Sequence, residues 1–293
     1  MLLREALQSA IARLNDEHVP SPRLNAETLL MFTLNCDRAH LYAHPERKLT
    51  EEERARYNEA LTQRVKGVPA QYITGHQEFW GLDLIVSPAV LIPRPETEHL
   101  IETILPLAKP MKSPKIADVG TGSGAIALAL AKELPEAEIH ATDNSPAALE
   151  IAEANAARLQ LELTSKNHYP PKRRLFFHDT NLLEGLEGAF DFVVSNPPYV
   201  GLSEEDEVQL EVRKFEPRTA VFAGPSGLEV IEKLIPAAYG VLKPGGYLMM
   251  EISGTIAEAV RGLLNDEWDE VKITPDLQGI PRIVTARKPH HSA

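Results

Sequence analysis

Four consecutive residues, Asn196-Pro197-Pro198-Tyr199, carry groups that could together bind a flat NH2 group. They follow the apolar run 190–195, which predicts a buried strand, so they should lie at the carboxyl edge of a sheet. Because prolines lack a backbone N–H, the carbonyl of Pro197 and the side-chain oxygen of Asn196 are available as paired acceptors. Tyr199 adds an aromatic face. The stretch predicts a site for an amide or an aromatic amine.

A glycine-rich loop lies upstream, between a predicted strand and a predicted helix, and runs Gly120-Thr121-Gly122-Ser123-Gly124. Glycines have no Cβ, so a ligand can approach this backbone closely near the positive end of the helix. The spacing is Gly-x-Gly-x-Gly, whereas nicotinamide-dinucleotide enzymes use Gly-x-Gly-x-x-Gly. The loop therefore favours S-adenosylmethionine, which has an adenosine to anchor and no pyrophosphate. An Asn-Pro pair alone often only ends a strand, but this loop favours a functional role for it.

Two acids follow the next two predicted strands. Asp143 ends the strand 138–142, about 20 residues after the loop, where an acid can bind ribose hydroxyls. Asp179 ends the strand 174–178 and should lie beside Asp143, in position to bind the amino group of adenine. Either acid alone could be a helix cap or a turn residue. Together with the loop, they favour a nucleoside site.

Strands and helices alternate through the second part of the chain, which predicts right-handed βαβ units and a parallel sheet. A final pair of strands, 270–274 and 282–286, suits an antiparallel hairpin at the sheet edge. The expected fold class is α/β, with a seven-stranded Rossmann-like sheet. The other predicted strands are 115–119, 138–142, 174–178, 190–195 and 246–252, and the helices are 125–134, 146–159, 228–242 and 255–264.

The N-terminal part has a different period. Apolar residues recur at helical spacing from Leu3 to Leu14, and Thr50 with Glu53 forms a capping box before a further helix. Near-alternation after Val68 then suggests a β-hairpin. The expected domains are a helical bundle over 1–75, a hairpin linker over 76–95 and an α/β domain over 96–293. Residues 165–173 are predicted to form an inserted loop.

Arg94 lies between two prolines, in the segment Ile92-Pro93-Arg94-Pro95-Glu96. Its backbone freedom is therefore small. It is either an ordinary surface ion-pair residue or part of a segment that closes over the active site and contacts the substrate.

Metal binding is not expected. His40 and His44 are four residues apart, but Pro45 follows and no third ligand is near. Cys36 is the single cysteine, so an internal disulfide is excluded.

The formal net charge of −12 should repel a phosphate backbone, so direct nucleic-acid binding is not expected. The sequence lacks both a signal-peptide core and an apolar run of the roughly 20 residues that a membrane helix needs. We therefore expect a cytoplasmic protein without membrane contact, acting as a monomer.

Taken together, these motifs resemble the class I S-adenosylmethionine-dependent methyltransferases and, more narrowly, the release factor glutamine methyltransferases (the PrmC/HemK family). The resemblance covers nearly the whole chain. Its most specific part is the segment Leu91 to Glu98, which general methyltransferases lack. The other matching segments are 79–81, 118–124, 195–200, 212–218 and 276–279 with Arg282.

This resemblance implies that S-adenosylmethionine is the methyl donor and S-adenosylhomocysteine the product. The methyl acceptor is implied to be the glutamine of the Gly-Gly-Gln loop in bacterial class I release factors. By the same resemblance, the loop 120–124 and Asp143 hold the cofactor, Asp179 and Thr180 contact adenine, and residues 196–199 hold the glutamine. The helical bundle is implied to grip the release factor.

Three positions depart from the family pattern: Thr180 often corresponds to a tryptophan, Ser253 to a glycine, and 165–173 is an insertion. Other functions also remain open. An adenine-specific DNA methyltransferase would use the same Asn-Pro-Pro-Tyr sequence but needs a basic groove for a flipped base. Methylation of a ribosomal-protein glutamine and a non-catalytic, cofactor-binding adaptor are further alternatives.

Overall fold

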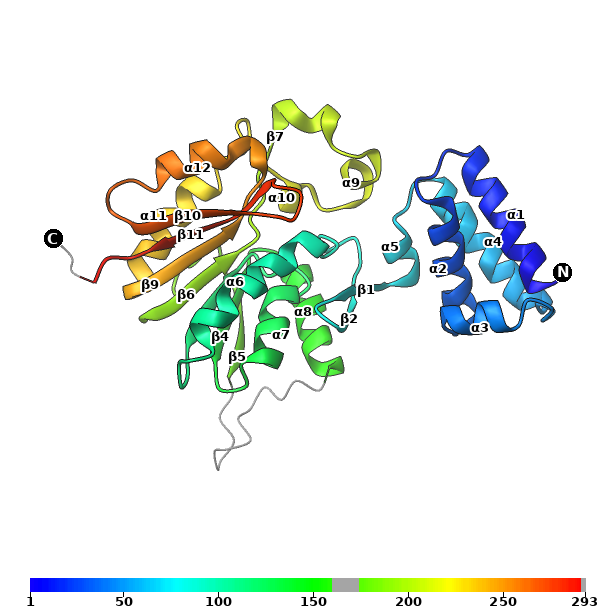
Figure 1. Ribbon diagram of the computed structural model, residues 1–293, viewed down its shortest axis with the longest axis horizontal. Helices are drawn as coiled ribbons and strands as arrows, with labels where there is room; N and C mark the ends of the chain where they lie inside the picture. The colour runs from blue at the N-terminus through cyan, green and yellow to red at the C-terminus, as the bar shows by residue number, and fades with distance from the viewer. Residues whose placement is uncertain (160–173, 291–293) are drawn as a thin grey trace. The chain divides into compact units, whose positions relative to one another are not determined.

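The computed structural model describes residues 1–159 and 174–290 (Figure 1). The chain divides into two compact units. The first unit contains Met1–His76 and Gln209–Phe215, and the second contains Gln77–Val208 and Glu216–Ala293. The predicted insertion at 165–173 lies outside the described residues. Within the described residues, no helix combines the length and apolar character that crossing a bilayer requires.

Short helices packed around one apolar core form the first unit. Leu14, Leu30 and Tyr57 are completely or almost completely buried in it. The predicted capping box is present, because Thr50 Oγ1 accepts from the Glu53 N–H at 3.1 Å while Glu53 Oε2 accepts from the Thr50 N–H at 2.9 Å. The helices are α1 (Leu3–Asp16), α2 (Pro22–Leu34), α3 (Arg38–Ala43), α4 (Glu51–Val65) and α5 (Ala70–Thr74). Helices α3 and α5 were not predicted, since neither is long enough to show a period.

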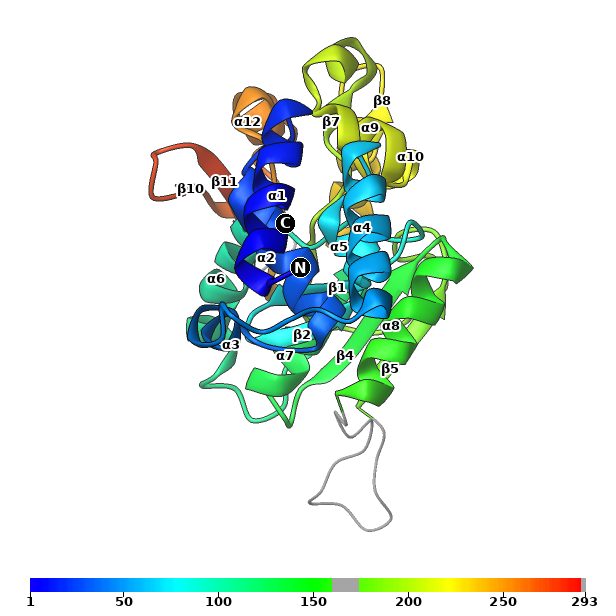
Figure 2. The same ribbon diagram turned by 90° about the vertical axis from the view of Figure 1, so that its right-hand side faces the viewer.

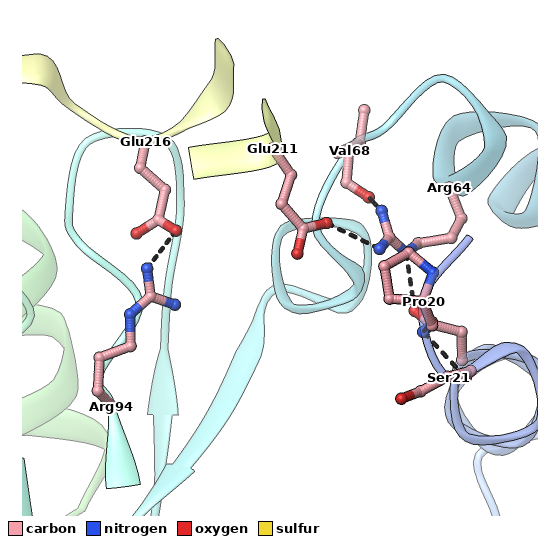
Figure 3. A network of polar contacts seen from close by, with 8 residues as sticks. Pro20, Ser21, Arg64, Val68, Arg94, Glu211 and Glu216 are labelled. Carbon is pink, nitrogen blue, oxygen red and sulfur yellow. Dashed lines mark hydrogen bonds and ion pairs between the residues drawn. The ribbon is translucent and has the colours of Figure 1, made fainter. Parts of the chain in front are cut away.

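A helix from far along the chain, α9 (Leu210–Phe215), completes this unit. The guanidinium of Arg64, whose side chain is 5% exposed, donates to Glu211 Oε2 at 2.7 Å. It also donates to Asn25 Oδ1 at 2.8 Å and to the Val68 carbonyl at 3.0 Å. Figure 3 shows the guanidinium of Arg64 joined to both Val68 and Glu211. The sequence did not predict that residues 209–215 belong with the helical unit.

The second unit is built on a seven-stranded sheet, as predicted, with the strand order β10-β11-β9-β6-β3-β4-β5. Strands β5, β4, β3, β6 and β9 run parallel, whereas β11 is antiparallel to both β9 and β10. Strands β10 and β5 therefore form the two edges of the sheet (Figure 2). The strands are β3 (Lys115–Val119), β4 (Glu138–Asp143), β5 (Leu175–Asp179), β6 (Phe190–Ser195), β9 (Leu242–Glu251), β10 (Asp269–Pro275) and β11 (Pro281–Arg287).

Helices cover both faces of this sheet, because successive strand residues point to opposite sides. Val194 belongs to the core under α6, α7 and α8, and Val193 belongs to the core under α11 and α12. The helices are α6 (Glu98–Ala108), α7 (Ala125–Glu133), α8 (Pro146–Arg158), α10 (Arg218–Val221), α11 (Ile231–Val241) and α12 (Ala257–Leu263). A short parallel pair, β7 (Val200–Gly201) and β8 (Phe222–Gly224), lies apart from the main sheet.

The predicted hairpin consists of β1 (His76–Phe79) and β2 (Leu82–Ile85). Its two-residue turn has φ values of +52° at Trp80 and +65° at Gly81, as a type I′ turn requires. Asn155 on α8 donates to the Ile85 carbonyl at 2.9 Å and to the Ser123 carbonyl at 3.0 Å. One buried amide therefore links this hairpin to the glycine loop.

The contacts of Arg64 predict that replacing this residue strongly destabilises the first unit. Arg64→Leu leaves Glu211 and two further acceptors without their donor, so the first unit should lose about 3 kcal/mol of stability. Arg54 lies on the same helix and only pairs with the exposed Glu51. Arg54→Leu should therefore cost less than about 1 kcal/mol. Denaturant unfolding followed by circular dichroism measures both variants, and equal losses would contradict the role of Arg64.

Candidate active site

A cavity opens at the carboxyl ends of β3, β4 and β6. It encloses about 930 Å³, including its open mouth, which lies in the range of roughly 300–1,000 Å³ typical of small-molecule sites. The predicted site residues that line it are Gly120, Gly122, Asp143, Thr180, Asn196, Pro197 and Pro198. The structure therefore places two glycines of the predicted cofactor loop and three of the four residues of the predicted amide site on one cavity.

The first two glycines of the loop leave room for a ligand. Gly120 and Gly122 have φ values of +72° and +56°, and a Cβ built on either would meet no atom within 4 Å. Gly124 has a different role, because a Cβ there would lie 3.0 Å from Leu128 and 3.3 Å from Ala152. It allows α7 and α8 to pack closely.

The other two loop residues lie beneath the cavity surface. Thr121 and Ser123 are buried, and neither is among the residues that line the cavity. Thr121 donates its hydroxyl proton to Asp118 Oδ2 at 2.6 Å, and Ser123 accepts through its carbonyl from Asn155. These contacts shape the loop from below.

Asp143 and Asp179 pair in register at the ends of β4 and β5, as the sequence predicted. Asp143 Oδ2 accepts from the Gly122 N–H and its Oδ1 from the Ser145 N–H, both at 2.9 Å. Burial raises the pKa of Asp143, although these N–H donors oppose the shift. The acid therefore holds the glycine loop while it also lines the cavity.

The two residues predicted to contact adenine lie differently. Asp179 is exposed and is not among the residues that line the cavity. Thr180 lines the cavity and donates its hydroxyl proton to the Glu184 carbonyl at 2.9 Å. Asn181 and Leu182 extend this wall, which the sequence analysis did not identify because neither residue forms a motif.

Asn196 combines one engaged atom and one available atom. Its Nδ2 donates to Thr97 Oγ1 at 3.1 Å. Within residues 1–159 and 174–290, no hydrogen bond occupies Asn196 Oδ1 or the carbonyl oxygen of Pro197. Both residues line the cavity, so the two acceptors expected from the sequence are available at its wall.

Tyr199 packs against the apolar core and does not line the cavity. Its ring packs against the core under α11 and α12, and its hydroxyl donates to Glu251 Oε1 at 3.2 Å. Burial and the neighbouring Glu251 carboxylate raise the pKa of Tyr199, so the phenol stays protonated at neutral pH. Tyr199 is not among the residues that line the cavity, so its ring is not available there as a stacking face.

Two residues next to this group escaped the sequence analysis. Thr97 ends the short 3₁₀ helix η1 (Pro95–Thr97), and Glu251 ends β9. Both are almost completely buried, and Thr97 Oγ1 donates to Glu251 Oε2 at 2.6 Å. Thr97 lies within the family-specific segment, but nothing in the sequence pairs it with an acid 154 residues away.

Arg94 forms an ion pair. Its Nη2 lies 2.5 Å from Glu216 Oε1 (Figure 3). Glu216 Oε2 accepts from the Ile92 N–H at 3.1 Å. The side chain of Arg94 remains 34% exposed, whereas that of Glu216 is 1% exposed. The contact fixes the segment before η1 onto residue 216.

The described part of the chain holds no group of three or more His, Cys, Asp or Glu side chains arranged for a metal ion. The ring centroids of His40 and His44 lie 4.6 Å apart, with the ring planes tilted by 49°.

Comparisons with known proteins agree with this arrangement. The hMettl16 catalytic domain, solved in complex with an RNA hairpin, superposes with a TM-score of 0.56 at 16% identity, covering 80% of this chain and 83% of that one. Residues 96–213 match the family described as methyltransferase small domain. The second unit therefore has the fold of a class I methyltransferase.

Sequence relatives narrow this class. Residues 5–75 match the family described as PrmC N-terminal domain. A release factor glutamine methyltransferase of Koribacter versatilis is 53% identical over 291 residues, covering 99% of each chain, and one of Moorella thermoacetica is 41% identical, covering 98% of each. The chain belongs to the release factor glutamine methyltransferase family.

Asp118, beneath the loop, provides a test of the electrostatics of the site. It is completely buried, its Oδ1 has no partner in the described residues, and burial raises its pKa from 3.8 to about 7. The proton is held more tightly in the folded state, so the contribution of Asp118 to stability is lost as pH rises through about 7.

The variant Asp118→Asn lacks this titration. Between pH 5 and pH 8, its free energy of unfolding should therefore rise relative to that of the unmodified protein by about 3 kcal/mol. Denaturant unfolding at the two pH values measures the difference. A constant difference would mean that Asp118 keeps an ordinary pKa.

Proposed function

We propose that the protein transfers a methyl group from S-adenosylmethionine to the side-chain nitrogen of the glutamine in the Gly-Gly-Gln motif of class I release factors. The observation that carries the proposal is the pair of free acceptors, Asn196 Oδ1 and the Pro197 carbonyl, on the same cavity as the glycine loop. Family membership supports the choice of acceptor, since the relatives are named as release factor glutamine methyltransferases. Such a substrate implies action in the cytoplasm.

The residues of the cavity suit the proposed methyl donor. The open space above Gly120 and Gly122 admits a ligand against the backbone, and Asp143 on the same wall can accept from ribose hydroxyls with its remaining lone pairs. We infer that these three residues hold the donor, with Thr180 near the adenine. Asp179 is exposed and does not line the cavity, so we expect it to contribute less to binding of the donor than the other predicted contacts.

An amide nitrogen is a poor nucleophile because its lone pair is shared with the carbonyl group. If Asn196 Oδ1 and the Pro197 carbonyl accept its two hydrogens, the nitrogen is held in one orientation and becomes more electron-rich. When bound, S-adenosylmethionine supplies an electrophilic methyl carbon, whose bonding electrons remain on sulfur as the nitrogen attacks. The methylated nitrogen then loses a proton to water, so no general base is needed. Positioning is thus the main contribution of these two residues.

Tyr199 and Arg94 support this site from outside the cavity wall. Pro198 and the Tyr199 ring fix the backbone that carries the Pro197 carbonyl, because proline restricts φ and the ring is packed in the core. Arg94 fixes the preceding segment through Glu216 and keeps one third of its side chain exposed for a substrate contact.

Adenine in DNA is the chemically closest alternative acceptor, because its exocyclic amine is equally flat. The net charge of −12 opposes binding of a duplex and so favours the protein substrate. Radiolabelled methyl transfer to a release factor, to its Gly-Gly-Ala variant and to duplex DNA, run in parallel, separates the two. We expect label only in the unmodified factor, and label in DNA would refute the proposal.

The variant Asn196→Ala removes one acceptor without touching the glycine loop. Its kcat should fall by about 100-fold or more, since a single positioned polar group is worth that much in comparable sites. Calorimetry should give a dissociation constant for S-adenosylhomocysteine that is nearly unchanged. Turnover near that of the unmodified protein would contradict the proposed orientation of the glutamine.

We infer that the helical unit binds the release factor away from the reacting glutamine. Its α2 helix exposes two large apolar side chains, Leu24 at 53% and Phe32 at 50%. Apolar side chains exposed in this way are typical of protein-binding surfaces when they gather on one helix.

The double variant Leu24→Ser, Phe32→Ser should raise KM for the intact release factor about tenfold and leave KM for a short Gly-Gly-Gln peptide unchanged, since about 1.4 kcal/mol of lost contact is a tenfold change. Steady-state kinetics with both substrates measures the effect. An unchanged KM for the intact factor would exclude this face.

A further inference from the structure

A buried chain of hydrogen bonds leads from β9 to the proposed glutamine site. The side chain of Glu251 is almost completely enclosed, at 1% exposed, and each of its oxygens accepts one hydroxyl proton. Thr97 donates to Oε2 at 2.6 Å, and Tyr199 donates to Oε1 at 3.2 Å. Thr97 itself is 4% exposed. Because Glu251 accepts from Thr97, the direction of the hydrogen bond between Thr97 and Asn196 is also determined.

A threonine hydroxyl has one proton. Because Thr97 donates that proton to Glu251, its oxygen can only accept from the next group in the chain. That group is Asn196, whose side-chain amide lies 3.1 Å away through Nδ2. An amide carries its donors on nitrogen and its acceptor on oxygen, so Nδ2 must face Thr97 and Oδ1 must lie on the other side.

We propose that Thr97 and Glu251 are positioning residues that fix the side-chain amide of Asn196 with its oxygen toward the substrate nitrogen. This inference rests on the proposed function and extends it to two residues that touch neither substrate nor cofactor. An Asn196 amide turned by 180° would present N–H groups to the NH2 of the glutamine. Two donors facing each other cannot bond, so the turned state is unproductive.

The direction of the chain depends on the charge of Glu251. An ionised carboxylate accepts from Thr97, whereas a protonated one could donate to Thr97 and reverse every bond up to Asn196. Burial raises the pKa of Glu251, with the hydroxyl donors of Thr97 and Tyr199 and the charge of Arg282 opposing the shift and Glu96 adding to it. Since the ionised form is the productive one, kcat should fall as pH drops through that pKa.

Kinetics of matched threonine variants test the inference. Thr97→Val keeps the shape but removes the hydroxyl, and its kcat should fall by about 10- to 100-fold, the loss that a misplaced group causes. The dissociation constant for S-adenosylhomocysteine should stay within about twofold of the unmodified value, because Thr97 is buried and does not line the cavity. Thr97→Ser, which keeps the hydroxyl, should restore most of kcat and the acid limb of its pH profile.

Thr103 offers a control on α6. Its hydroxyl donates to the His99 carbonyl within the same helix, at 2.7 Å, and has no link to Asn196. Thr103→Val should therefore leave kcat unchanged. If Thr97→Val also has normal kcat, or if Thr97→Ser is as impaired as Thr97→Val, the positioning role is refuted.

A readout without turnover separates this inference from the proposed function. In ¹⁵N-labelled protein, the Asn196 Nδ2 hydrogen that faces Thr97 should exchange slowly with solvent, and Thr97→Val should abolish this protection. Fast exchange in the unmodified protein would refute the positioning chain whatever the substrate is. Slow exchange without methyl transfer to a release factor would instead refute the proposed function and leave the chain intact.

Discussion

The parallel pairing of β3, β4, β6 and β9 is the constraint on which the site depends. Val119 pairs with Thr142 and with Ser195, and Ser195 pairs with Met250, so the four strands end at one level. The next residue on each strand is a site residue. Gly120, the first residue of the glycine loop, follows Val119, and Asp143, Asn196 and Glu251 follow the other three strand residues. A slip of one residue would exchange the faces of a strand and move its terminal group away from the others. The register of these pairings therefore positions the site.

Buried polar groups at this edge are held by specific donors. Asp118, Asp143 and Glu251 all have raised pKa values, and burial is the main cause in each case. Each accepts hydrogen bonds from nearby hydroxyl or backbone N–H groups, which offset part of the cost of burial. These bonds also fix the directions of the groups that face the cavity. The energetics of burying the acids and the geometry of the site are therefore linked.

Much of the fold could be predicted because its signals are local. The strands 115–119 and 190–195 are predicted with their observed bounds, since apolar runs followed by glycine or proline leave few alternatives. The glycine spacing and the Asn-Pro-Pro-Tyr stretch likewise indicate part of the cavity wall, namely Gly120, Gly122 and the residues 196–198. Contacts between distant segments gave no such signal. The pairing of Thr97 with Glu251 and the packing of 209–215 with the first unit depend on the folded chain.

The proposed function depends above all on one piece of geometry, a flat NH2 group held by two oxygen acceptors at the edge of the sheet. A crystal structure of the protein with S-adenosylhomocysteine and a Gly-Gly-Gln peptide would test it most directly. We predict that the glutamine nitrogen lies about 2.7–3.2 Å from both Asn196 Oδ1 and the Pro197 carbonyl oxygen. A glutamine whose carbonyl oxygen faces Asn196, or whose nitrogen lies away from both acceptors, would contradict it.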